Sequence, residues 1–198
     1  SADDGLMGHQ GFIGAHLPDG GAVTGPHMTF ESYKFPDNKY QLHACCHGLH
    51  PMIEALQASE AATGVPLDDI KSFSLSTNPR WLAVCDIKRP RTGLEVKFSY
   101  NWLAGMTLRG DNTGDDRLFT DTIAGEAELG RFAERISVTG DDQLTDLQAR
   151  GEISLTDGRA IPVWFDLADP FAPEVLAEKL QRKSCLLYTS PSPRDSMT

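Results

Sequence analysis

The first half of the chain alternates between apolar stripes with helical spacing and short extended runs. Apolar residues at 52, 53 and 56 share one helix face behind Pro51, and Gly64 is a typical residue to end such a helix. The pattern therefore predicts a helix over 52–63. Residues 40–45 are expected to be extended and residues 70–75 to form a strand. Residues 81–85 are apolar throughout, which fits either a buried strand or a short helix.

A capping box predicts the next helix. Thr92 is a typical N-cap, and Glu95 stands three residues later, where its side chain can reach back to the cap. Apolar positions 96, 100, 103 and 106 then follow helical spacing, so we expect one helix across them. Short helices are expected at 117–124 and 126–133.

The last third of the chain is predicted to form strands and then a helix. We expect strands at 136–138, 151–155 and 161–165, with Asp157-Gly158 as the tight hairpin between the last two. Pro162 cannot donate a ladder hydrogen bond, so the last strand is expected at a sheet edge or bulge. Pro173 then opens a helix. This order predicts an α+β fold, a two-layer sandwich with helices packed on one face of a sheet.

Composition and charge exclude several classes of protein. Of 198 residues, 40% are hydrophobic and 23% charged, and the formal net charge is −10. These values indicate a globular chain that repels nucleic-acid phosphates, so we expect no nucleic-acid partner. No run reaches the roughly 20 apolar residues of a membrane span, so we expect no membrane partner. The start of the chain does not resemble a signal peptide, and the four cysteines do not form a spaced disulfide framework. We therefore expect reduced thiols and a cytoplasmic protein.

The pattern divides the chain into four parts. Residues 1–30 are rich in Gly and His and are expected to be irregular, residues 31–168 to form the α+β domain, and residues 169–183 to form a helix that leaves it. Residues 184–198 resemble the translation of a transposon-end sequencing adapter, and we interpret them as an artefact, a natural tail being the alternative. The first residue is not Met, so we expect the true N-terminus to lie upstream.

All six histidines fall in the first 50 residues: His9, His16, His27, His43, His47 and His50. The densest cluster spans 43–50 and also contains Cys45 and Cys46. Imidazole and thiolate are the ligands that zinc prefers, but these residues are contiguous and lack the paired spacing of zinc sites. We therefore predict no metal and no other cofactor.

The same cluster supports acid–base chemistry. His50 stands directly before Pro51 at a predicted helix start, where free amides and the helix dipole attract anions and favour a neutral imidazole. A carboxylate substrate bound there would suit a histidine that accepts a proton near pH 7. The alternative is that His50 only caps the helix.

Three segments resemble the MmgE/PrpD family, which includes 2-methylcitrate dehydratase and cis-aconitate decarboxylase. His43-Ala-Cys-Cys-His-Gly-Leu-His50-Pro, followed by an apolar helix, is similar to the family's segment with Cys, Gly and His. Glu95-Val-Lys-Phe-Ser99 is similar to its Glu-Ala-Lys-Phe-Ser segment, and residues 149–159 resemble its late hairpin. The segments occur in the family's order, and the resemblance covers about residues 5–183.

The resemblance implies an α+β lid domain, a two-layer α/β sandwich, whose larger all-helical domain is missing from the chain apart from remnants. It implies an active site between the two domains, to which the lid contributes the histidine that matches His50. Lys97 and Ser99 match the lid's Lys-Phe-Ser motif and are expected to bind substrate. Trp102 stands where many relatives have Tyr, and Gln41 where many have Lys. These departures leave the particular reaction open.

Three hypotheses of function follow. The first is a fragment of a hydro-lyase or carboxy-lyase of propionate catabolism or a related route, acting on a small polycarboxylate such as 2-methylcitrate or cis-aconitate. His50 would be its general acid or base, the full-length protein a homodimer, and the fragment alone inactive. The second is a dicarboxylate epimerase or isomerase of the same family. The third is a non-enzymatic α+β interaction module with Trp81, Trp102 and Trp164 facing a partner.

Overall fold

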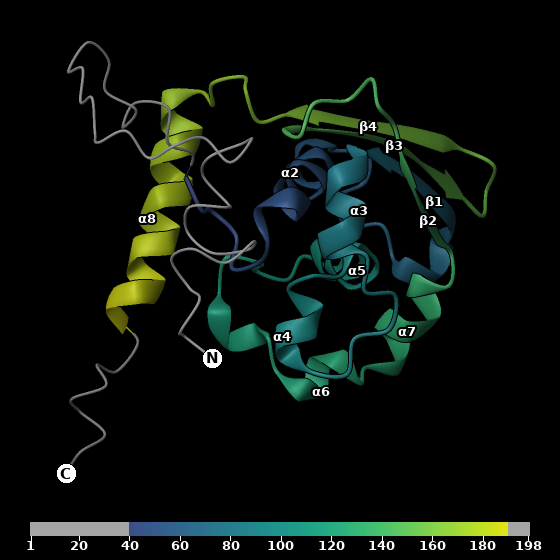
Figure 1. Cartoon of the computed structure of the whole chain (residues 1–198), viewed down its shortest axis with the longest axis horizontal. Coiled ribbons are helices and arrows are strands. Elements are labelled where there is room, and N and C mark those ends of the chain that lie inside the picture. The colour runs from purple at the N-terminus through teal and green to yellow at the C-terminus, as the bar shows by residue number, and fades with distance from the viewer. Residues whose placement is uncertain (1–39, 190–198) are drawn as a thin grey trace, which may run out of the picture. The chain divides into compact units, whose positions relative to one another are not determined.

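The computed structural model describes residues 40–189, and these form a sheet with helices on one face (Figure 1). The α+β sandwich predicted from the sequence is thereby confirmed. The segment expected to be irregular, residues 1–30 with His9, His16 and His27, lies outside the described residues.

The sheet has four strands in the order β2-β1-β3-β4. Their bounds are Ile70–Thr77 for β1, Ile136–Gly140 for β2, Gln148–Leu155 for β3 and Ala160–Asp166 for β4. Strand β1 runs parallel to β2 and antiparallel to β3, which pairs antiparallel with β4. The Asp157-Gly158 hairpin is confirmed, with Gly158 at φ +89°. Pro162 lies on the edge strand β4, as its missing N–H requires.

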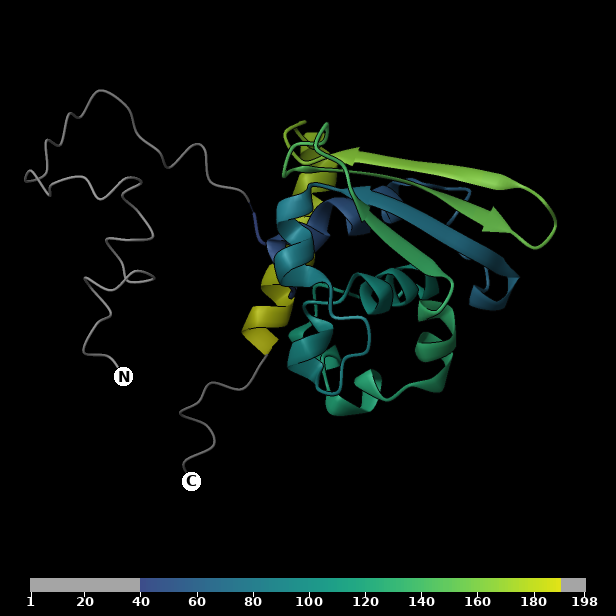
Figure 2. The ribbon, with the colours of Figure 1, turned by 45° about the vertical axis from the view of Figure 1, so that its right-hand side comes forward.

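The strands alternate between the helix layer and the opposite face of the sheet. In β1, Phe73 and Leu75 are buried while Ser72 and Ser74 are exposed. Figure 2 shows the helices gathered beneath one face of the sheet. Burying every second side chain on one face is what gives a sheet its two-layer packing.

The helix layer is built around α2 (His50–Ala58) and α5 (Tyr100–Arg109), which pack on each other. Helix α2 also packs on β3 and β4, and α5 packs on α7 (Ala127–Ala133). The remaining helices are α3 (Pro79–Cys85), α4 (Gly93–Val96), α6 (Asp121–Ala124) and α8 (Pro173–Thr189), with 3₁₀ turns η4 (His47–Leu49), η5 (Leu67–Asp69) and η6 (Asp116–Leu118). The apolar run at 81–85, which the sequence left open, is therefore helical. Positions 52, 53 and 56 of α2 are fully buried, as their spacing predicted.

Several boundaries differ from the predictions, and the helix expected at 117–124 is a 3₁₀ turn at Asp116–Leu118 followed by a short helix at Asp121–Ala124. Residues 40–42 have no regular structure and residues 43–45 form bends, so the expectation of an extended run over 40–45 was wrong. Helix α2 ends at Ala58 and not at Thr63, because Ser59 is extended (φ −87°, ψ 97°) and the following turn places Ala62 in the core. Gly64 closes this turn at φ +77°, a conformation that favours glycine.

The single helix expected across positions 92–106 is broken into α4 and α5. Thr92 caps α4 as predicted, accepting from Glu95 N–H. The backbone then leaves the helix, because its carbonyls accept hydrogen bonds from other segments. Lys97 O accepts from Cys46 N–H at 3.0 Å, and Phe98 O accepts from Ile87 N–H at 3.2 Å. Ser99 starts the second helix, since its side chain accepts from the backbone N–H of residue 102.

Helix α8 begins at Pro173 as expected and continues to Thr189, six residues beyond the predicted end at 183. Among the tryptophans proposed to face a partner, Trp102 is buried in the helix layer, which contradicts that role for it. Trp164 on β4 is half exposed, and Trp81 is partly buried.

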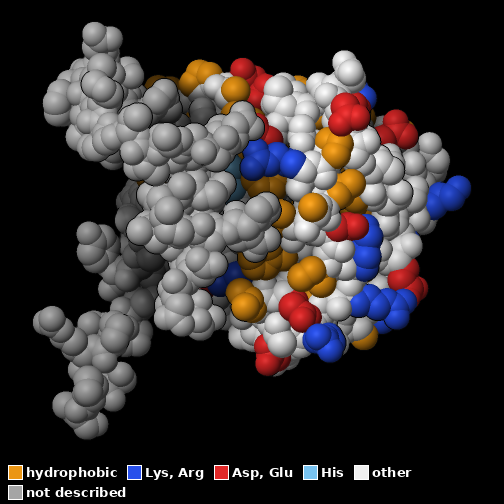
Figure 3. All heavy atoms as spheres, in the orientation of Figure 1, with side chains coloured by type: hydrophobic (Ala, Val, Ile, Leu, Met, Phe, Trp, Pro, Cys, Tyr) orange, Lys and Arg blue, Asp and Glu red, His pale blue; other side chains and the backbone are white. Residues whose placement is uncertain are grey.

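Acidic and basic side chains are mixed over the face shown in Figure 3, with apolar groups between them. Val84 on α3 and Leu94 on α4 are among the exposed large apolar residues. Within residues 40–189, the structure contains no helix that is both long and apolar enough to span a membrane.

Candidate active site

Residues 43–50, which we call the histidine turn, lead from an irregular segment into α2. Three hydrogen bonds fix the backbone of this turn. Ala44 N–H donates to Thr113 O at 2.8 Å, Cys46 N–H donates to Lys97 O, and Gln41 Nε2 donates to Cys45 O at 2.7 Å. The turn is therefore held by two loops that are distant in sequence, and Gln41 supports its backbone.

Gly48 lets the histidine turn pack closely against two aromatic side chains. A Cβ atom at this position would lie 2.4 Å from the ring of Trp81, so a larger residue does not fit without a shift. The Gly48 carbonyl accepts a hydrogen bond from the Tyr100 hydroxyl at 2.9 Å. Tyr100 is fully buried at the start of α5, and burial raises the pKa of its phenol, which keeps it protonated.

The three imidazoles of the turn lie against one another. The His50 ring centroid is 4.9 Å from that of His43, with the ring planes nearly perpendicular at 81°. On the other side, the His47 ring centroid lies 4.8 Å away at 45°. His43 and His50 are buried, whereas His47 is partly exposed. The central ring, His50, is thus placed between the other two.

His43 connects this cluster to a buried carboxylate. Its Nε2 lies 2.9 Å from Glu54 Oε1, and its Nδ1 lies 2.7 Å from Thr113 Oγ1. Lys179 of α8 donates to both oxygens of Glu54, at 2.8 and 3.0 Å. Glu54 is 3% exposed, so a carboxylate with three hydrogen bonds lies inside the domain.

The charges of this network follow from its contacts. Burial by itself would raise the pKa of Glu54, but the hydrogen bond from His43 and the charge of Lys179 outweigh it, so the pKa is lowered and Glu54 is ionised. Burial lowers the pKa of His43, which stays neutral. An ionised Glu54 can only accept, so His43 Nε2 carries the proton and Nδ1 accepts from the Thr113 hydroxyl.

His50 is also neutral. Burial, followed by the nearby His43 and His47, lowers its pKa to about 3, while the backbone carbonyls of Cys45 and His43 act in the opposite direction. Its Nε2 is buried and has no hydrogen-bond partner among residues 40–189. A buried nitrogen left unpaired is unusual in a folded protein and marks the atom most suited to meet a ligand.

We expected a helix N-terminus with free backbone amides at His50, and this expectation is wrong. The 3₁₀ turn η4 runs directly into α2, so helical backbone already begins at His47. Leu49 N–H donates to Cys46 O, and His50 N–H donates to His47 O. The amide of His50 is therefore not available to an anion, and burial, not the helix dipole, keeps its imidazole neutral.

Cys45, Cys46 and Cys85 are all free thiols. Burial raises the pKa values of Cys45 and Cys85, which keeps both protonated and weakens them as metal ligands. In the described part of the chain, no group of three or more His, Cys, Asp or Glu side chains is arranged to hold a metal ion.

Comparison with known protein families decides the relationship that the sequence suggested. The model of the MmgE/PrpD C-terminal domain matches residues 43–187, more than half of the chain. The chain belongs to the MmgE/PrpD family. This family is associated with enzymes, and the matched region contains the whole histidine turn, Glu54 and Lys179. No curated protein matches the chain.

The two other residues predicted from the MmgE/PrpD motif lie on either side of the break between α4 and α5. Lys97 forms an ion pair with Asp116, and its ammonium lies 5.1 Å from the ring centroid of Phe119. Its backbone carbonyl is the acceptor of Cys46 N–H, which links it to the histidine turn. Ser99 is fully buried, and its hydroxyl caps α5. The prediction that both bind substrate stays a prediction.

Sequence reasoning missed three residues of the hydrogen-bond network behind the histidine turn: Glu54, Thr113 and Lys179. Glu54 carried a usable signal, because it lies one helical turn after His50 on the apolar side of α2. Thr113 and Lys179 carried none, since they reach His43 and Glu54 from 70 and 125 residues away in sequence.

Proposed function

We propose that this MmgE/PrpD domain is the lid of a lyase that removes water or CO₂ from a small polycarboxylate such as 2-methylcitrate or cis-aconitate. His50 is the general acid or base, and the second half of the active site is supplied by an all-helical domain. The observation that carries the proposal is the buried, neutral His50 with an unpaired Nε2, held between two further histidines.

The tautomer of His50 supports a role as a base. The backbone carbonyls of Cys45 and His43 favour a proton on the ring, and Nε2 has no partner within residues 40–189. The proton therefore belongs on Nδ1, which leaves the lone pair of Nε2 available. In dehydration, Nε2 would take the proton from a carbon beside a substrate carboxylate, and the hydroxyl would leave as water with a proton from an acid on the helical domain. In decarboxylation, His50 would act in its imidazolium form and deliver the Nε2 proton to the carbon that CO₂ has left.

Substrate charge offsets the low pKa of His50. In the domain alone, burial makes protonation costly. A bound carboxylate would place negative charge beside the ring, stabilise the imidazolium and bring the pKa towards neutrality. Glu54 holds His43 by a hydrogen bond, and the His43 ring packs against that of His50. His43 and Glu54 are therefore proposed as positioning residues and His50 as the catalytic one.

Lys97 and Ser99 are proposed to hold the substrate. Lys97 is paired with Asp116, which is three-quarters exposed. An exposed partner is readily exchanged for a substrate carboxylate, because such a pair contributes little stability. Ser99 would bind substrate only if its hydroxyl can donate while its oxygen caps α5.

We further propose that the intact enzyme acts in the cytoplasm as a homodimer. The free thiols of Cys45, Cys46 and Cys85 suit a reducing compartment. Epimerisation of a dicarboxylate is the second candidate; it needs two opposed acid–base groups, so its second group would have to face His50 from the helical domain.

The test compares the 198-residue chain with the same chain joined to the helical domain of a MmgE/PrpD relative. Both are assayed with 2-methylcitrate and cis-aconitate, in D₂O as well as H₂O. We expect turnover only with the two-domain protein. Turnover by the chain alone contradicts the two-domain active site, and inactivity of the two-domain protein on both substrates contradicts the polycarboxylate lyase. Deuterium incorporation with retention of all carboxylates and hydroxyls identifies the epimerase instead.

A further inference from the structure

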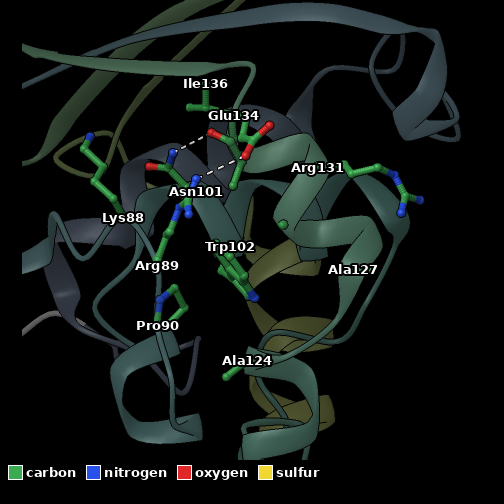
Figure 4. Close-up of a pocket in the computed structure, with 12 residues that line it drawn as sticks. Lys88, Arg89, Pro90, Asn101, Trp102, Ala124, Ala127, Arg131, Glu134 and Ile136 are labelled. Carbon is green, nitrogen blue, oxygen red and sulfur yellow. Dashed lines mark hydrogen bonds and ion pairs between the residues drawn. The ribbon is translucent and has the colours of Figure 1, made fainter.

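A hollow lies between α5 and α7, on the other side of α5 from the histidine turn. It has a volume of about 590 Å³, which is within the size range of small-molecule sites. Figure 4 shows Trp102 and Asn101 of α5 facing the segment Lys88-Arg89-Pro90. None of the three histidines of the turn lines this hollow, which we call the α7 pocket. The pocket is thus a separate site and not part of the proposed active site.

Asn101 supplies the polar group of the α7 pocket. Its side chain is 4% exposed, and its Nδ2 donates to the carbonyl of Ala133 at 2.8 Å. That bond fixes the orientation of the amide, since only the nitrogen can donate to a carbonyl. The amide oxygen Oδ1 is buried and has no hydrogen-bond partner in the described part of the chain. Asn101 lines the pocket, so this covered acceptor lies at the pocket wall and would require a donor.

The walls of the α7 pocket are small and apolar. Gly130 has no side chain, and a Cβ added there would first meet the indole of Trp102, at 4.0 Å. The other small residues are Ala124, Ala127 and Ala133. These positions leave room beside the Trp102 ring, so the body of a ligand would be apolar.

Two cationic side chains at the mouth of the α7 pocket are paired with carboxylates. Arg89 donates to Glu134 at 3.2 Å, and these two side chains are 82% and 67% exposed. Lys88 pairs with Asp86. Figure 4 shows the Arg131 side chain pointing away from the pocket, so its charge does not belong to the mouth. An ion pair as exposed as that of Arg89 is weak and is easily exchanged for a ligand carboxylate.

We propose that the α7 pocket binds a small monoanionic organic acid that carries a hydroxyl group opposite its acid group. The hydroxyl donates to Asn101 Oδ1, the apolar body lies against Trp102, and the carboxylate pairs with Arg89 at the mouth. A compound with carboxylates at both ends does not fit, because a carboxylate cannot donate to Oδ1. The ligand therefore differs in chemistry from the polycarboxylate of the proposed active site, and either proposal can be refuted without affecting the other.

The first experiment uses three probes that differ by one group. They are 4-hydroxybenzoate, 4-methoxybenzoate without the hydroxyl donor, and 4-hydroxybenzyl alcohol without the charge. Each is titrated into the 198-residue chain and followed by amide chemical shifts. We expect 4-hydroxybenzoate to bind with a Kd of about 1–10 mM, the range for so small a ligand, with shifts at Asn101 and Trp102. We expect each of the other two probes to bind about fivefold to tenfold more weakly.

Variants separate the pocket from the rest of the surface. Gly130→Leu fills the space beside Trp102 without touching Asn101, so binding should be lost. Arg89→Gln should weaken binding of 4-hydroxybenzoate about fivefold. Arg80→Gln is the matched control, because Arg80 is also exposed and paired with one carboxylate, Asp146, but does not line the pocket. It should leave the Kd unchanged.

Several outcomes would overturn the proposal. One is that 4-methoxybenzoate binds as tightly as 4-hydroxybenzoate. Another is that the Gly130→Leu variant binds 4-hydroxybenzoate with an unchanged Kd. A third is that about 10 mM 4-hydroxybenzoate shifts no amide signal near Asn101. Asn101→Leu is a second test of the acceptor, but it also breaks the bond to Ala133 O and can unfold the domain. Gly130→Leu breaks no such hydrogen bond, so this variant can refute the proposal even if Asn101→Leu does not fold.

Discussion

Helix α5 separates the histidine turn from the α7 pocket, and the surroundings of the buried polar groups differ between these two regions. On the first side, Tyr100 donates to Gly48 O, and Thr113 and Glu54 occupy both ring nitrogens of His43. On the second side, Asn101 and Trp102 border a hollow of about 590 Å³. Each region nevertheless leaves one buried polar atom unpaired, His50 Nε2 in the turn and Asn101 Oδ1 in the pocket.

The difference shows how each unpaired atom can be used. His50 Nε2 lies among other titratable groups, so its environment controls a proton. Asn101 Oδ1 lies among small apolar residues and does not titrate, so its environment selects a ligand by shape and by one hydrogen bond. The domain thus combines a site suited to proton transfer with one suited to recognition.

The largest effect is expected from breaking the network behind the histidines. Glu54→Ala removes the acceptor of His43 Nε2–H and the partner of Lys179, so it should lower the free energy of unfolding by about 3 kcal/mol. Gln57→Ala is the control, because Gln57 accepts from the same Lys179 but at the surface, and should cost less than about 0.5 kcal/mol. Urea unfolding of both variants gives the comparison. Equal losses would show that the buried pair has no special role.

The next effect concerns catalysis in the two-domain protein. His50→Gln keeps hydrogen bonding but cannot carry a proton, so it should reduce kcat by at least ~10²-fold, the low end for loss of an acid or base. His47→Ala should reduce it far less, since His47 lies in the preceding turn. The rates are measured beside thermal melting of each variant. If His50→Gln retains most of the wild-type rate at unchanged stability, His50 has only a structural role.

Acid should destabilise the histidine turn more than the α7 pocket. The pKa of His50 is about 3 in the folded chain and near its ordinary 6.5 when unfolded, so between these values the unfolded chain binds the additional proton. Stability from His50 is thus complete above pH 6.5 and falls as the pH decreases, by about 2 kcal/mol at pH 5. The lowered pKa values of His43 and Glu54 act in the same direction.

His50→Gln should therefore flatten the dependence of unfolding free energy on pH between 5 and 7, measured in urea at several pH values. The slope will not vanish, because His43 remains and its pKa is also lowered from an ordinary value of 6.5. Gly130→Ala on the pocket side should leave the slope as it is in the parent chain. An unchanged slope in His50→Gln would mean that His50 is not buried in solution.

The smallest effect compares one glycine from each region. Gly48→Ala should destabilise the chain by about 1.5 kcal/mol, because its Cβ would overlap the Trp81 ring. Gly130→Ala should be neutral or stabilise by up to about 1 kcal/mol, since its Cβ has only an ordinary contact at 4.0 Å and lies within α7. Thermal melting distinguishes them. A loss of stability in Gly130→Ala would mean that the α7 pocket is not open.

Much of the fold could be predicted from the sequence, because local signals determine it. Alternation predicted β1, the Asp-Gly pair predicted the hairpin, and Pro162 predicted the edge position of β4. Thr92 and Pro173 likewise indicated where helices begin. In each case the physical cause lies within a few residues, in a capping hydrogen bond, a fixed φ or a missing N–H.

The candidate site was only partly visible in the sequence. The cluster 43–50 could be selected by residue type, and its resemblance to the MmgE/PrpD family agrees with the family match. The proposed reason for its chemistry was incorrect, because helical backbone already begins at His47 and the His50 amide is bonded within the turn. A local reading of the helix start could not detect η4, which depends on how Cys46 is bound to Lys97.

The sequence by itself indicated the four strands, the starts of several helices, the buried stripe of α2, and the presence of a histidine cluster before α2. Only the tertiary structure decided what that cluster can do. It paired His43 with Glu54 and Thr113, brought Lys179 to the carboxylate, and buried His50 between two imidazoles. It also broke one predicted helix at Phe98 and opened the α7 pocket beside Asn101. Capping, alternation and turns act between near neighbours in sequence, whereas desolvation and charge pairing depend on residues up to 125 positions apart.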